Sequence, residues 1–176
     1  ISGPADYQQI KKFHHQDMMG VTDLAKRTDA EYAEIFGRSY GVVEPYRCDD
    51  AELILVTSGT TAGTARIAID ALREAGIAAG TLKVRLFRPF PREEIAAAIG
   101  NTPTVAVLDR NISLGSGGVF AGELKSALYD RDIRPAVLGL VAGLGGGDLT
   151  PTIIENIARG ALERKRSDQA VLWEEV

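Results

Sequence analysis

The strongest constraint on the fold is a series of short apolar runs that alternate with amphipathic segments between residues 53 and 164. Each run is continuous enough to be a strand buried on both faces, and the four runs are Leu53–Thr57, Thr81–Phe87, Thr104–Asp109 and Ala136–Val141. Helices are expected after them, over residues 60–75, 92–99, 119–129 and 151–164. Four β-α units in succession predict a parallel sheet with helices on both faces, joined by right-handed crossovers.

The first 40 residues differ in pattern from the rest and predict helices that precede an α/β domain of residues 41–176. Apolar residues recur at three- to four-residue steps from Asp6 to Gly37, which indicates a helical stripe that needs a partner to cover it. Thr28 and Glu31 have the spacing of a capping box, so a second helix is expected to begin at Thr28 and to end at Gly37. A short strand is expected over residues 42–47.

Composition excludes several classes of protein. The single cysteine, Cys48, cannot form an internal disulfide, hold an iron–sulfur cluster or build a thiolate zinc site, and a reducing, cytoplasmic location fits it best. The apolar runs are far shorter than the ~20 residues of a membrane helix, so no membrane partner is expected. A net charge of −4 argues against nucleic acid as the partner. The chain starts without Met or a signal-peptide pattern, so we expect it to be a piece of a longer polypeptide.

Ligands of open parallel sheets bind outside the carboxyl ends of the strands, so the loops after the four runs are the candidate sites. Gly59 and Thr60 follow a strand and open a helix, where backbone N–H groups could hold an anion. The alternative is an ordinary turn with a threonine N-cap. The loop lacks the lysine of a phosphate-binding loop and the full dinucleotide fingerprint.

A second candidate loop combines charged, amide and hydroxyl side chains with three glycines, and it contains Asp109, Arg110, Asn111, Ser113, Gly115, Gly117 and Gly118. That mixture could bind a phosphate or carboxylate, or it could lock one loop against another through pairing of Arg110 with Asp109.

Two further positions complete the set of possible anion or interface residues. Arg88 belongs to a basic stretch that would face a partner surface or an acidic ligand, and the competing explanation is an exposed position at the sheet edge. Asp148 follows a glycine-rich loop, and the segment Asp148–Pro151 starts a helix. No catalytic residue and no metal ligand is identified. His14 and His15 point about 100° apart on a helix, and the thiol of Cys48 lies beside two acids.

Several segments together resemble one family. They are Phe36–Tyr40, Val43–Arg47, Val56–Gly59, Leu72–Gly76, Leu82–Pro91, Val107–Asn111 and Ala142–Thr150. They look like the second domain of the pyruvate:ferredoxin oxidoreductase alpha chain, and the Arg-Pro-Phe-Pro and Leu-Asp-Arg-Asn pieces are the most specific. More distantly, the strand ending in Arg88-Pro89 and the loop before Glu123 are similar to the C-terminal domain of transketolases and of 2-oxoacid dehydrogenase beta chains.

The resemblance implies a three-layer α/β/α domain with a five-stranded, mostly parallel sheet whose antiparallel edge strand is residues 42–47. It also implies a parent enzyme that converts a 2-oxoacid and CoA to acyl-CoA and CO₂ and reduces ferredoxin. Thiamine diphosphate, Mg²⁺ and iron–sulfur clusters would lie in other domains or subunits of that multi-subunit complex, and ferredoxin would be an indirect partner. The present domain would be a scaffold that is inactive alone. Relatives usually have Arg where this chain has Gly147, which would remove a contact across an interface. A small-anion or nucleotide-binding module and a 2-oxoacid dehydrogenase domain are the alternatives.

Overall fold

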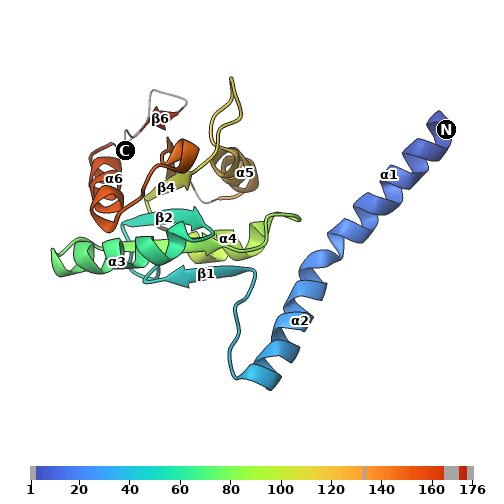
Figure 1. The fold of residues 1–176 in the computed structure, drawn as a ribbon, viewed down its shortest axis with the longest axis horizontal. Coiled ribbons are helices and arrows are strands. Elements are labelled where there is room, and N and C mark those ends of the chain that lie inside the picture. The colour runs from blue at the N-terminus through green and yellow to red at the C-terminus, as the bar shows by residue number, and fades with distance from the viewer. Residues whose placement is uncertain (1–2, 133, 165–170, 174–176) are drawn as a thin grey trace.

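A six-stranded sheet forms the centre of the computed structural model, which describes residues 3–132, 134–164 and 171–173 (Figure 1). The elements in chain order are α1 Pro4–Met19, α2 Val21–Phe36, β1 Val43–Tyr46, β2 Leu53–Ser58, α3 Thr61–Glu74, β3 Ala79–Val84, α4 Arg92–Ile99, β4 Thr104–Asp109, α5 Val119–Leu128, β5 Ala136–Val141, the 3₁₀ turn η1 Leu144–Gly146, α6 Pro151–Glu163 and β6 Leu172–Trp173. The four predicted β-α units are therefore all present.

The strand order is β1-β3-β2-β4-β5-β6, and every neighbouring pair is parallel except β1 with β3. The predicted antiparallel edge strand is thus confirmed. The predicted count of five strands is wrong, because β6 adds a sixth strand beside β5 through the pairs Leu140 with Leu172 and Val141 with Trp173. A two-residue strand is too short to produce an alternation that a sequence pattern can reveal.

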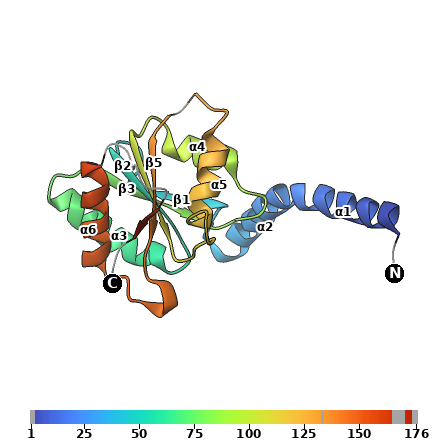
Figure 2. The ribbon, with the colours of Figure 1, turned by 90° about the horizontal axis from the view of Figure 1, so that it is seen from above.

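Alternating side chains of the strands fill two separate cores. Leu53 and Leu55 of β2 face α3 and α6, whereas Ile54 and Val56 face α4 and α5. Figure 2 shows the two helix pairs on opposite sides of the sheet, which is the expected three-layer α/β/α arrangement. The side chains of Leu53 to Val56 are each at most 1% exposed. The unbroken apolar run in the sequence is therefore explained by burial of β2 on both faces of the sheet.

Helices α1 and α2 form an arm that leaves the α/β domain (Figures 1 and 2). The break between them is at Gly20, so the prediction of a helix beginning at Thr28 is wrong. Residues 21–27 continue the helix without interruption, which places Thr28 inside α2 rather than at its start. The predicted end at Gly37 is confirmed by its left-handed backbone, with φ of 69°.

Candidate functional site

The loops marked by the sequence leave the sheet on one side, because β3, β2, β4 and β5 are parallel neighbours. Two of these loops, after β4 and β5, are joined by hydrogen bonds from Arg110. The loop after β3 contacts α5 through Arg88, and the loop after β2 is exposed at Gly59 and Thr60. We take this carboxyl edge of the sheet as the candidate site.

Asp109 lies at the end of β4 and is fully buried. Its Oδ1 accepts hydrogen bonds from the backbone N–H of Phe120, at 3.0 Å, and from the amide of Asn111, at 3.2 Å. Its Oδ2 accepts from the N–H of Ala121, at 3.1 Å. Burial raises the pKa of the Asp109 carboxyl, and these three hydrogen bonds oppose that rise. The N–H of Val119 donates to Asn111 Oδ1 at 3.2 Å.

The amino terminus of α5 is therefore occupied by the protein's own side chains. Its first three N–H groups, which in other proteins hold phosphates or carboxylates, are bound by Asp109 and Asn111. These two residues come from the same candidate loop, but they act as a helix cap rather than as an open anion site.

Glycines permit this arrangement. A Cβ added to Gly118 would lie 2.0 Å from Asp109 Oδ2, so any side chain there would displace the carboxylate. Ser113 and Gly117 pair with each other as a tight antiparallel bridge, and Gly117 has a φ of 129° that favours glycine. Gly115, with φ of 81°, lies at the exposed tip between them.

Arg110 points to the other glycine-rich loop instead of pairing with Asp109. Its guanidinium donates to the carbonyl of Gly143, at 3.2 Å from Nη2, and to the carbonyl of Gly147, at 3.1 Å. The loops after β4 and β5 are thus held together by Arg110, and the expected pairing of Arg110 with Asp109 is wrong because Asp109 is turned to the N–H groups of α5. Asp148 follows as an exposed residue.

The loop after β2 leads into α3, a helix that has no side-chain cap at its amino terminus. Gly59 and Thr60 are exposed, and Thr60 makes no capping hydrogen bond to α3. Nearby in the chain, the Oγ1 atom of Thr57 is buried and has no hydrogen-bond partner among the described residues. Because side chains alternate along β2, Thr57 lies on the same sheet face as Leu55, the face covered by α3 and α6.

Arg88 contacts α5 and not the other candidate loops among the described residues. Its Nη2 forms an ion pair with Glu123 at 2.6 Å, and its guanidinium lies 4.0 Å from the centre of the Phe87 ring. The Phe87 ring in turn packs against Phe120, with centroids 4.7 Å apart. The loop after β3 is thus attached to the amino-terminal half of α5, close in sequence to the residues that Asp109 caps.

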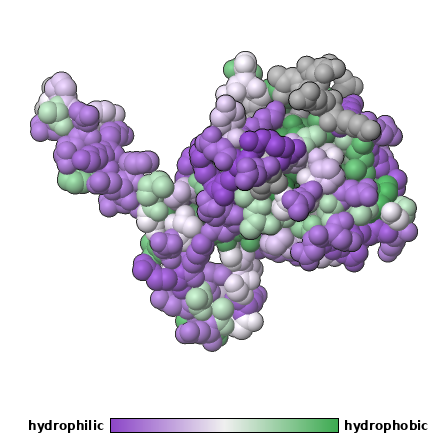
Figure 3. Space-filling view, turned by 180° about the vertical axis from the view of Figure 1, so that it is seen from behind, coloured by the Kyte–Doolittle hydropathy of each residue, from purple (hydrophilic) through white to green (hydrophobic). Residues whose placement is uncertain are grey.

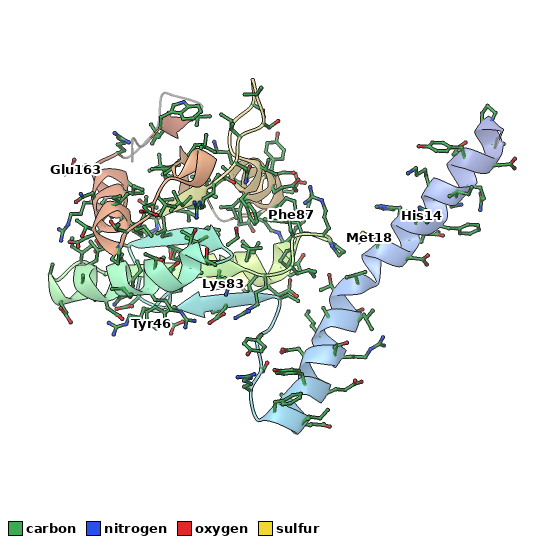
Figure 4. The ribbon with its side chains drawn as sticks, in the orientation of Figure 1. His14, Met18, Tyr46, Lys83, Phe87 and Glu163 are labelled. Atoms are coloured by element: carbon green, nitrogen blue, oxygen red, sulfur yellow. The ribbon has the colours of Figure 1, made fainter. Side chains whose placement is uncertain are left out.

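A cluster that the sequence patterns did not reveal lies at the β1 edge. Glu44 forms ion pairs with both Arg66 of α3 and Arg85. Partial burial raises the pKa of Glu44, but the two guanidinium groups outweigh it and hold that pKa below its usual value. Figure 4 shows Tyr46 and Lys83 on the neighbouring strands of this edge, and the Tyr46 hydroxyl donates to Asp70 at 2.9 Å. Only the alternation of β1 could have suggested that Glu44 and Tyr46 share a face.

The described residues offer no cluster of side chains that could hold a metal ion. No group of three His, Cys, Asp or Glu side chains within residues 3–132, 134–164 and 171–173 could hold a metal ion. The thiol of Cys48 is buried, and burial raises its pKa, so it is not a poised metal or cluster ligand. Among the helices in the described part of the chain, none combines the length and apolarity that crossing a bilayer demands.

Comparison with known proteins finds one family model, pyruvate:ferredoxin oxidoreductase core domain II, which matches residues 51–154. The pyruvate synthase subunit PorA of Methanothermobacter thermautotrophicus is 49% identical over 173 residues, which cover 98% of this chain and 43% of that subunit. The ketoisovalerate oxidoreductase subunit VorA of Pyrococcus abyssi is 35% identical over 181 residues, covering 98% and 45%. The chain therefore spans less than half the length of these curated relatives.

Two solved structures share the fold. A 2-oxoglutarate:ferredoxin oxidoreductase from Magnetococcus marinus aligns with a TM-score of 0.52 and 20% identity, over 92% of this chain and 24% of that one. A split-gene transketolase aligns with a TM-score of 0.55 and 19% identity, over 74% and 46%. At these identities the likeness shows the fold alone, and it confirms the expected transketolase-like architecture.

Proposed function

The chain belongs to the family of pyruvate:ferredoxin oxidoreductase core domain II, and from this membership we propose that it is a scaffold and interface domain of a thiamine-diphosphate-dependent 2-oxoacid:ferredoxin oxidoreductase. In the complete enzyme, a 2-oxoacid and CoA would be converted to acyl-CoA and CO₂ with reduction of ferredoxin. The relatives named for pyruvate and for ketoisovalerate each match 98% of the chain, so the proposal leaves the 2-oxoacid open.

The observation that carries the scaffold role is the internal use of the charged groups at the carboxyl edge. Asp109 and Asn111 bind the first N–H groups of α5, and Arg110 binds the carbonyls of the Gly143–Gly147 loop. A catalytic carboxylate must be free to meet a ligand, whereas the buried Asp109 carboxylate already accepts three hydrogen bonds from its own chain. Arg110 likewise directs its Nε and Nη2 atoms to backbone carbonyls of its own chain. These contacts hold the loop after β4, the amino terminus of α5 and the Gly143–Gly147 loop together at the edge of the sheet.

In this proposal the cofactor chemistry belongs to other parts of the enzyme. Thiamine diphosphate with Mg²⁺, and the iron–sulfur clusters, would be bound by other domains or subunits, and ferredoxin would be contacted only indirectly. Such an assembly would operate in the cytoplasm. The contribution of this chain is a rigid surface against which those domains pack, and the Arg88–Glu123 ion pair helps to fix that surface.

The proposal is tested by assembly. The tagged chain is produced together with the remaining oxidoreductase subunits, and the purified complex is assayed for reduction of methyl viologen with pyruvate, CoA and thiamine diphosphate. We expect the chain to co-purify with an active complex. If the active complex assembles without it, or if the chain fails to bind those subunits, the scaffold role is refuted.

A second candidate function is a small-anion or nucleotide-binding module, and one observation favours it. The amino terminus of α3 has no side-chain cap, and the loop residues before it, Gly59 and Thr60, are exposed. Calorimetry with inorganic phosphate, CoA and thiamine diphosphate separates the two candidates. The scaffold role predicts no affinity tighter than about 1 mM, and the binding module predicts tighter binding that a Gly59→Val substitution removes.

The third alternative, the C-terminal domain of a 2-oxoacid dehydrogenase beta chain, is disfavoured by the family match. Residues 51–154 fit the ferredoxin-dependent family. The transketolase-like likeness that prompted this alternative extends only to the fold.

A further inference from the structure

The arm carries large apolar side chains that the described part of the chain leaves uncovered. Tyr7, Ile10, Phe13 and Met18 of α1 have exposed fractions of 58%, 43%, 53% and 45%. No residue of α1 or α2 is buried. Figure 1 shows α1 extending away from the α/β domain, and Figure 3 shows green surface interrupting the purple of the arm. We refer to these four residues as the arm stripe.

The arm stripe occupies one side of its helix. At 100° per residue the four side chains fall within an arc of about 140°, whereas Lys12 lies on the opposite side. Asp6, His14 and Asp17 lie in the same arc, and Figure 4 marks His14 and Met18 on α1. An arc of four apolar and three polar side chains has the mixed composition of a surface that packs against protein rather than against lipid.

An apolar groove continues this surface along α2. It is lined mainly by Val21, Leu24, Ala25, Tyr32 and Tyr40. Leu24 is 52% exposed and Tyr40 is 40% exposed. Val21 begins α2 one residue after the break at Gly20, so the groove follows directly from the stripe. Together they form one exposed apolar face along the arm.

A helix in this state requires a covering partner. Most helical stability in proteins comes from packing of an apolar face rather than from the intrinsic propensity of the helix. Helix α1 has 16 residues and buries none. Its large apolar side chains are still 43–58% exposed, so a covering surface would bury more apolar area and stabilise the helix.

We propose that the arm stripe and the α2 groove pack against the polypeptide that forms the unmatched part of the relatives, the part in which the proposed function locates the thiamine-binding domains. The inference rests on the proposed function. The argument for this occupant is length: matches that cover 98% of this chain account for only 43% and 45% of the two relatives. More than half of each relative is thus available to cover the arm, and its contact surface would be apolar with a hydrogen-bond donor opposite Asp17.

The test uses thiol labelling, because the native Cys48 is buried at 6% exposure and gives little background. Ile10→Cys and Phe13→Cys report on the stripe, and Lys12→Cys is the matched control on the opposite side of α1. Each variant is treated with a maleimide dye, both as the isolated chain and in the purified active oxidoreductase complex. We expect all three to label at similar rates in the isolated chain. In the complex, the stripe positions should label at least about tenfold more slowly, while Lys12→Cys is unchanged.

Each outcome separates this inference from the proposed function. Equal labelling of stripe and control in an active complex overturns the inference and leaves the proposed function intact. Slow labelling of the stripe already in the isolated chain, with twice the monomer mass, shows that a second copy covers it and also overturns the inference. If the chain binds no oxidoreductase subunits, both fail. Should the stripe variants alone prevent assembly while Lys12→Cys assembles, the stripe is supported as the contact.

Discussion

Replacing Gly118 with alanine tests the cap at the start of α5. Gly118 has φ of −63° and ψ of 137°, a conformation that alanine adopts without strain, so the effect of the substitution is steric. The new Cβ would lie 2.0 Å from Asp109 Oδ2 and 2.7 Å from Asp109 Cβ. The carboxylate must therefore move away from the N–H groups of Phe120 and Ala121.

The expected loss of stability follows from the two hydrogen bonds that Asp109 would no longer accept from Phe120 and Ala121. Hydrogen bonds to a charged group contribute about 1.5–3 kcal/mol each, and two backbone donors lose their acceptor in a buried position. We expect Gly118→Ala to lower the free energy of unfolding by about 3–5 kcal/mol, measured by urea denaturation. The midpoint of thermal unfolding should fall by about 10 °C for a chain of this size.

Gly122→Ala is the matched control, four residues further along the same helix. A Cβ there meets no heavy atom within 4 Å, and the position is exposed. Alanine should therefore raise the stability by up to about 1 kcal/mol through helix propensity. If Gly118→Ala is as stable as the unsubstituted chain to within about 0.5 kcal/mol, Asp109 does not cap α5 as described.

Three further predictions concern the same edge of the sheet. Thr57→Val removes a buried hydroxyl that has no hydrogen-bond partner among the described residues, so it should leave the free energy of unfolding unchanged or raise it by about 1–2 kcal/mol in the same urea assay. Thr81→Val is the control: it breaks a 2.8 Å hydrogen bond to the backbone carbonyl of Leu55 and should lower the free energy of unfolding by about 1 kcal/mol. Because burial raises the pKa of Asp109, the folded state binds the proton more tightly than the unfolded state, and the contribution of this group to stability falls as the pH rises from 3.8, the usual pKa of an aspartate, through the raised pKa. The difference in free energy of unfolding between the unsubstituted chain and Asp109→Asn should therefore shrink across that pH window. A difference that stays constant with pH would contradict the assigned burial. Arg110→Ala should lower the free energy of unfolding by about 1–2 kcal/mol and speed amide hydrogen exchange in residues 142–150. Lys125→Ala on α5 is the control and should change neither quantity. Unchanged exchange in Arg110→Ala would show that Arg110 does not hold the two loops together.

The sequence patterns predicted the fold well where burial is uniform. The strand over Thr104–Asp109 and the helix over Arg92–Ile99 have the bounds expected for them, because an apolar run buried on both faces and an amphipathic helix each leave a clear pattern. The patterns failed where the signal is short or ambiguous. Strand β6 has two residues, and the capping-box spacing at Thr28 occurs inside a helix that has no break there.

The residue types of the loop after β4 mark it as a candidate site, but they do not predict its contacts. The sequence suggests a pairing of Arg110 with Asp109, whereas Arg110 binds the Gly143–Gly147 loop and Asp109 binds α5. The partners could not be deduced, because Asp109 binds N–H groups 11 and 12 residues away and Arg110 binds carbonyls 33 and 37 residues away. Such contacts depend on how α5 and the β5 loop return to the sheet, which no local pattern specifies.

The most direct test of the scaffold role is the activity of the chain by itself. The purified chain is incubated with pyruvate, CoA, thiamine diphosphate, Mg²⁺ and methyl viologen under anaerobic conditions, with the assembled oxidoreductase as the positive control. We predict no viologen reduction above a sample that lacks the chain, while the assembled enzyme turns over. Reduction by the isolated chain would contradict the account, because it would require a catalytic centre in a domain whose charged groups we assign to holding its own loops.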